Sequence, residues 1–225
     1  VAAAPSRPAW DADSLLALYL DQREQDADLI VAGGVPAPAG WEAVLPRLEA
    51  AVRERGGGLL FGAREDGTRP RDLAVLITPG GTVVHTASHG RGIETGESLP
   101  PVVETPAGRV GILCGEEGFV PEVARILMLE GAEVLAWTAF AEEPMTERIA
   151  RARSDENRVY TAVAGPETAI ITAPNGAPLT IAPYGSGLAM AAQVNPAMAR
   201  WKDMAPGTNA LLDRIPGAYG DLVRE

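Results

Sequence analysis

Two kinds of apolar pattern alternate along the 225 residues. Short, nearly continuous apolar runs predict buried strands, and these lie at 28–32, 58–64, 72–78, 109–114, 133–138, 159–165 and 169–174. Apolar residues at helical spacing predict helices, and these lie at 11–26, 41–57, 121–132 and 145–158. Further strands are expected at 1–4 and 187–194, and a turn with a strand at 79–85 predicts a hairpin.

The expected strands outnumber the helices, and the order is not a strict strand–helix alternation. This pattern favours a layered α/β domain with mixed sheets. We expect residues 1–225 to form a single domain. Its tail, 195–225, is interrupted by prolines and cannot form a compact unit alone. We expect the tail to pack on the domain or on a partner subunit.

Composition excludes several classes of function. The net charge of −11 argues against nucleic acid or an anionic membrane as a partner, because both require clustered Lys and Arg. A single cysteine excludes an internal disulfide framework. The N-terminus does not resemble a signal peptide, and no apolar run approaches the length of a membrane span. We therefore expect a cytoplasmic protein, with no cofactor and no bound metal.

The single cysteine, Cys114, ends an apolar run in the stretch GILCGEEGFVPEVARIL, 111–127. A glycine, two glutamates and a helix opened by Pro121 follow it. A nucleophile at a strand-to-helix turn has this pattern, and so does a small buried residue at the end of a strand. The pattern alone leaves both interpretations open.

Six motifs in order resemble the nitrilase superfamily, the carbon–nitrogen hydrolases. They are ADLIV, GRVGILC with PEVARILMLEGAEVLAW, ARSDENRVYTAVAG, AIITAPNGAPL and DRIPGAY, together with the GGTVV hairpin. The resemblance covers nearly the whole chain. It implies a four-layer αββα sandwich that forms a homodimer or joins a protein partner in a larger complex.

The family's chemistry uses a cysteine nucleophile, a glutamate base and a lysine that stabilises the tetrahedral intermediate. By this resemblance Cys114 holds the nucleophile position, and the N–H of Gly115 is a candidate oxyanion donor. The segment from Cys114 to Glu122 is one residue longer than the family's usual spacing.

The other two members of that triad are missing at the matching positions. Gly33 and Gly34 stand where the resemblance implies the glutamate, and His89 stands at or next to the lysine position. The only lysine, Lys202, lies in the tail. His89 is a candidate partner for the thiol, and nearby Arg91 is a candidate substrate-binding charge.

Four carboxylates remain to be considered. Glu94 and Glu97 precede the cysteine in a loop shorter than the family's. Glu116 and Glu117 follow it directly, and Glu117 is a candidate base. A carboxylate this close could instead raise the pKa of the thiol by like-charge repulsion.

Two functions follow. The first is a non-catalytic structural, regulatory or ligand-binding subunit, with a small molecule as one candidate ligand. The alternative is a divergent amidase or acyltransferase that acts on a small amide or acyl substrate through Cys114. Losing the general base costs about 10²–10⁴ in rate and losing an oxyanion stabiliser costs about 10²–10³, so the first interpretation is favoured.

Overall fold

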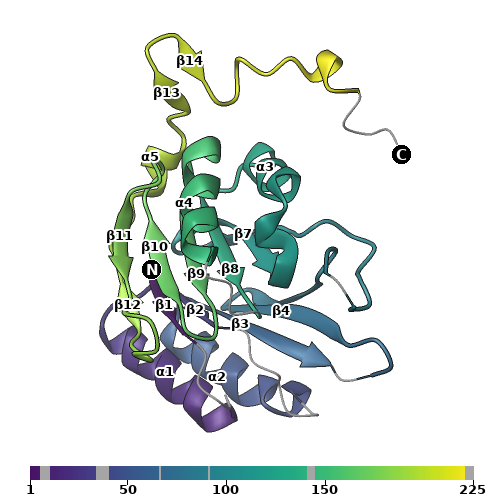
Figure 1. Cartoon of the computed structure of the whole chain (residues 1–225). Coiled ribbons are helices and arrows are strands. Elements are labelled where there is room, and N and C mark those ends of the chain that lie inside the picture. Colours follow the sequence, from purple (N-terminus) through teal and green to yellow (C-terminus); the bar gives the residue numbers. More distant parts are fainter. Residues whose placement is uncertain (6–10, 34–40, 66, 91, 141–144, 221–225) are drawn as a thin grey trace.

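The computed structural model describes residues 1–5, 11–33, 41–65, 67–90, 92–140 and 145–220. Two six-stranded sheets stack face to face, and helices cover the outer face of each (Figure 1). This is the expected four-layer αββα sandwich. Buried apolar side chains fill the space between the sheets and the space under each helix pair.

The first sheet has the order β12-β1-β2-β3-β4-β5, in which β1, β2 and β3 are parallel. Its strands are β1 (Ala2–Ala4), β2 (Leu29–Ala32), β3 (Gly58–Glu65), β4 (Arg71–Thr78), β5 (Gly81–Thr86) and β12 (Met190–Ala191). The helices α1 (Ala12–Glu24) and α2 (Leu45–Arg55), and the short η1 (Trp41–Ala43), contribute to the outer core of this sheet. Asp11 caps α1, because its carboxylate accepts from the Ser14 N–H at 2.8 Å.

The second sheet repeats the same plan, with the order β11-β10-β9-β8-β7-β6 and β7, β8 and β9 parallel. Its strands are β6 (Val102–Thr105), β7 (Gly108–Cys114), β8 (Val134–Thr138), β9 (Tyr160–Ala164), β10 (Ala169–Thr172) and β11 (Pro178–Ile181). The helices α3 (Pro121–Leu129) and α4 (Thr146–Asn157) cover it, and η2 (Gly115–Phe119) joins β7 to α3.

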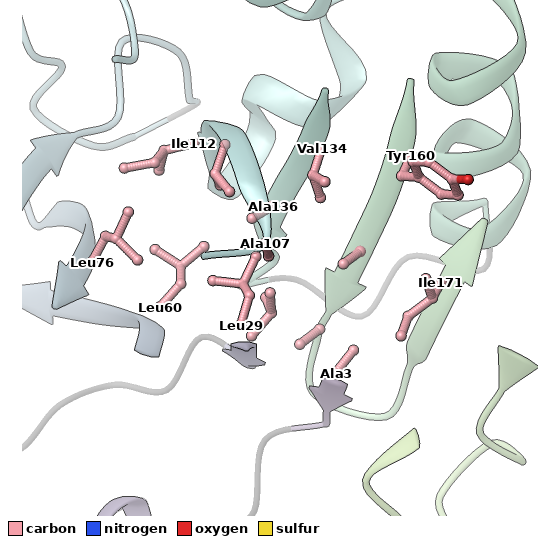
Figure 2. Packing of buried hydrophobic residues seen from close by; sticks show 14 of the residues in the cluster. Ala3, Leu29, Leu60, Leu76, Ala107, Ile112, Val134, Ala136, Tyr160 and Ile171 are labelled. Carbon is pink, nitrogen blue, oxygen red and sulfur yellow. The ribbon is translucent and has the colours of Figure 1, made fainter. Parts of the chain in front are cut away.

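The inter-sheet core explains why the strands read as continuous apolar runs. Leu29, Leu60 and Leu76 of the first sheet face Ile112 and Val134 of the second (Figure 2). The alternate residues of the same strands face the helices. A strand buried on both faces shows no polar alternation, so its sequence is apolar throughout.

The C-terminal residues depart from this compact plan. After α5 (Pro196–Ala199), the chain leaves the sandwich as an arm, residues 201–220, which carries β13 (Asp203–Ala205), β14 (Thr208–Asn209) and η3 (Pro216–Ala218). Figure 1 shows the arm extending beyond the α3–α4 layer. The expected strand at 187–194 is much shorter, since only Met190–Ala191 pair with β1.

Candidate functional site

Cys114 stands at the carboxyl end of β7, where the chain turns into η2. Its side chain is fully buried. Gly115 makes the turn with φ +57°, a conformation that favours glycine. A Cβ there would lie 3.3 Å from Asp72 Oδ2. The predicted strand-to-helix elbow therefore exists, and a carboxylate lies close behind it.

Two side chains from neighbouring elements hold the elbow in place. Trp137 Nε1 donates to the Gly115 carbonyl at 2.8 Å, and Arg153 donates to the carbonyls of Gly118 and Phe119 at 3.0 Å each. Phe119 also packs edge-on against Trp137, with ring centroids 5.2 Å apart. The elbow is thus tied to β8 and to α4, and the backbone around Cys114 is rigidly positioned.

Glu117 lies inside this elbow with none of its surface exposed. Its Oε1 is 2.8 Å from His85 Nε2 and accepts from Ser88 N and Ser88 Oγ at 2.7 and 2.6 Å. Its Oε2 accepts from the Cys114 N–H at 2.8 Å. Burial alone would raise the pKa of Glu117, but hydrogen bonds and attraction from His85, with hydrogen bonds from Ser88, outweigh it and lower that pKa. The predicted candidate base is therefore a charged carboxylate whose described bonds go to the backbone of Cys114 and to β5 and its following loop.

A second carboxylate approaches from β4. Asp72 is buried and forms a bidentate ion pair with Arg64, at 2.6 Å from Nε to Oδ1 and 2.9 Å from Nη2 to Oδ2. The Arg64 guanidinium lies 5.4 Å from the centre of the Phe140 ring. The charge of Arg64, which acts on Cys114, is thus already paired with a carboxylate.

These surroundings decide the state of the thiol. Burial raises the pKa of Cys114 well above its ordinary value, and the charges of Glu117 and Asp72 raise it further. A hydrogen bond from the Ala87 backbone and the charge of Arg64 act in the opposite direction but do not compensate. The thiol is therefore neutral at physiological pH, and the thiolate, which is the nucleophile, is disfavoured.

Thr138 adds an unusual polar atom beside the thiol. It is the register partner of Cys114 on the parallel strand β8, and it is completely buried. Its Oγ1 has no hydrogen-bond partner among the described residues.

The other predicted site residues are placed differently. His89 Nδ1 is 2.9 Å from Ser88 Oγ, and no described hydrogen bond joins His89 to Cys114. Gly33 is buried and donates its N–H to the Ala4 carbonyl at 2.9 Å. Glu94 and Glu97 are exposed. Gly34 and Arg91 lie outside the described residues, and the oxyanion role of the Gly115 N–H stays a prediction.

Sequence reasoning missed three residues of this site: His85, Asp72 and Arg64. The sequence pattern assigns no role to His85, yet its Nε2 lies 2.8 Å from Glu117 Oε1 in the elbow. The available signal was the alternation of faces along a strand, which can place His85 on the inner face of β5. In the structure His85 is the one fully buried position of that strand. The partners of Asp72 and Arg64 depend on tertiary contacts and left no comparable signal.

Within the described part of the chain, no group of three or more His, Cys, Asp or Glu side chains is arranged to hold a metal ion. No helix described by the structure is both long enough and apolar enough to cross a membrane.

Comparison of the chain with known proteins identifies its family. Residues 32–202 match the family model for carbon–nitrogen hydrolase. A search of curated proteins gives no match. Among solved structures, a carbon–nitrogen hydrolase from Helicobacter pylori is similar at 15% identity and TM-score 0.80, over 100% of this chain and 98% of that chain.

An amidase from Nesterenkonia sp. is similar at 18% identity and TM-score 0.76, over 99% of this chain and 95% of that one. A variant of that amidase, at 18% identity and TM-score 0.77 over 99% and 98% of the two chains, shows Michael addition of acrylamide at its active-site cysteine. At these identities the likeness shows the shared fold alone.

Proposed function

The chain belongs to the carbon–nitrogen hydrolase family, and we propose that it is a member without amidase activity that serves as a structural or regulatory subunit. One observation carries this proposal: the thiol of Cys114 is fully buried, and this burial together with the charges of Glu117 and Asp72 raises its pKa. Nucleophilic cysteines instead occupy partly exposed, electropositive surroundings.

The cations that could stabilise the oxyanion of an amidase intermediate are also poorly placed. The only lysine, Lys202, donates to the carbonyls of Asn157 and Arg158 at the far end of α4. Arg64, the cation that acts on Cys114, is committed to Asp72 through two hydrogen bonds. A cation whose charge is offset by a carboxylate stabilises a developing oxyanion poorly.

The proposal is tested by activity and by thiol chemistry on the same protein. Ammonia release from acetamide, propionamide and acrylamide should be equal for the wild type and for Cys114→Ala. Iodoacetamide at pH 8 should add one mass increment to unfolded protein and none to native protein over the same time. Ammonia release or an acyl adduct that depends on Cys114 would overturn the proposal in favour of the amidase or acyltransferase alternative.

We further propose that the arm, residues 201–220, contacts a second copy of this chain. Large apolar side chains on the arm are exposed to an unusual degree: Trp201 by 68%, Leu212 by 79% and Ile215 by 66%. Met204 and Tyr219 are also exposed on the same segment, which projects from the sandwich (Figure 1). Exposed apolar patches of this kind mark interaction sites.

A further inference from the structure

The arm is fastened to its own domain at the end of α4. Lys202 Nζ donates to the carbonyls of Asn157 and Arg158, at 3.1 Å each. Asn157 is the last residue of α4, and Arg158 follows it in the left-handed conformation with φ +51°. These carbonyls are the acceptors that a helix end leaves unpaired, so a single ammonium group closes the helix and holds the base of the arm.

Two arginines hold the arm farther along. Arg158 Nη2 donates to the Met204 carbonyl at 3.3 Å, and Arg125 Nη1 donates to the Ala210 carbonyl at 3.2 Å. The arm therefore rests on three cations that donate to backbone carbonyls. Its large apolar side chains are mostly exposed and contribute little to this attachment.

Lys202 differs chemically from the two arginines. A guanidinium stays protonated and is a poor nucleophile, whereas a lysine amine becomes nucleophilic when it loses its proton. Burial, and then repulsion from Arg125, lower the pKa of Lys202 to about 8, with Glu133 opposing the shift. At pH 8 about half of this amine is free, against about 0.3% for a lysine with the ordinary pKa near 10.5.

We propose that Lys202 is an acylation site and that acylation by a thioester releases the arm from the end of α4. The neutral amine attacks the thioester carbonyl carbon, so that a C–N bond forms and the C–S bond breaks. The thiolate leaves, and the proton lost by nitrogen is taken up by it or by water. The resulting amide has no charge and one N–H, so it can serve at most one of the two carbonyls.

Lys202 is the only lysine in the chain, so only one side-chain amine can be acylated in this way. The added acyl group also has to fit at a half-buried position beside Arg125. The inference concerns only the tether, so it is independent of Cys114 and of what the arm contacts.

The test uses S-acetyl-N-acetylcysteamine, a small acetyl thioester, on the full chain at pH 8. Peptide mass spectrometry measures acetylation of Lys202 against a lysine in an unstructured reference peptide. We expect Lys202 to react about tenfold faster or more, because a much larger fraction of its amine is free. The acetylated protein is then digested with an arginine-specific protease.

Cleavage after Arg200, at the base of the arm, should become about fivefold faster or more on acetylation, since proteolysis follows local opening. Cleavage after Arg55, at the end of α2, is the internal control and should not change. Lys202→Gln should be cleaved like the acetylated protein, and Lys202→Arg like the unmodified one. Acetylation no faster than in the reference peptide, or equal cleavage after Arg200 with and without the acetyl group, would overturn the proposal.

Discussion

At the scale of single residues, Glu117 has two effects on its neighbour Cys114. Its carboxylate fixes the elbow by accepting from the Cys114 N–H, from Ser88 and from His85. The same charge raises the pKa of the thiol. The interaction that positions the nucleophile backbone therefore also suppresses the nucleophile.

Removing the charge of Glu117 while keeping the shape of its side chain should make the thiol of Cys114 more reactive. Glu117→Gln is expected to lower the pKa of Cys114 and to raise the native rate of iodoacetamide addition severalfold, because the thiolate is the form that reacts. The rate is measured by intact mass between pH 7 and pH 9. Glu97→Gln, an exposed glutamate in a preceding loop, is the matched control and should leave the rate unchanged.

The same carboxylate predicts a dependence of stability on pH. Because the folded pKa of Glu117 is lowered, its contribution is fully present above the unfolded value of about 4.5 and is lost as pH falls through the lower folded value. Urea unfolding should show the wild type more stable than Glu117→Gln at pH 7, with the difference shrinking below pH 4.5. A difference that stays constant from pH 7 to pH 3 would contradict the role of the charge.

At the scale of elements, close packing of η2 on β8 requires a glycine. A Cβ on Gly118 would lie 2.1 Å from Trp137 Cε2, and Trp137 is completely buried. Gly118→Ala should therefore lower the free energy of unfolding by about 3 kcal/mol, at the upper end of overpacking costs. Gly217→Ala, where no atom lies within 4 Å of the new Cβ, should change it by less than about 0.5 kcal/mol. Denaturant unfolding of the two variants makes the comparison.

The sequence predicted the central elements because burial on both faces makes their apolar runs continuous. The apolar pattern missed β6 and β11, whose residues are largely exposed or half-buried and whose patterns are correspondingly weak. The hairpin of β10 and β11 was implied only by the resemblance of AIITAPNGAPL to the family, and the structure contains it. At the site, the position of Cys114 was recoverable from the strand-to-helix pattern. The burial of Glu117 and its bond to His85 were not, because they depend on how β5 and β7 from different sheets come together.

At the scale of the whole molecule, the sandwich and the arm are stabilised differently. The sandwich has three apolar cores, one between the sheets and one under each helix pair. The arm is held by hydrogen bonds from cationic side chains to backbone carbonyls, and its apolar side chains remain exposed. Changes to those side chains should thus alter association without altering the fold of the sandwich.

The final prediction separates these two contributions. Full burial of a leucine or isoleucine side chain is worth about 1.5–3 kcal/mol, so Leu212→Glu combined with Ile215→Glu removes a large share of any interface that the arm forms. Light scattering at about 20 μM, well above the dissociation constant of a stable dimer, should give twice the chain mass for the wild type and one chain mass for the double variant. Leu188→Glu, at a position 55% exposed on the body of the domain, should remain dimeric.

Because Leu212 and Ile215 are 79% and 66% exposed, the melting temperature of the double variant should match that of Leu188→Glu when both are measured as monomers at high dilution. A wild type that scatters as a monomer would contradict the proposed contact between copies. A double variant that stays dimeric would show that the copies meet through a surface other than the arm.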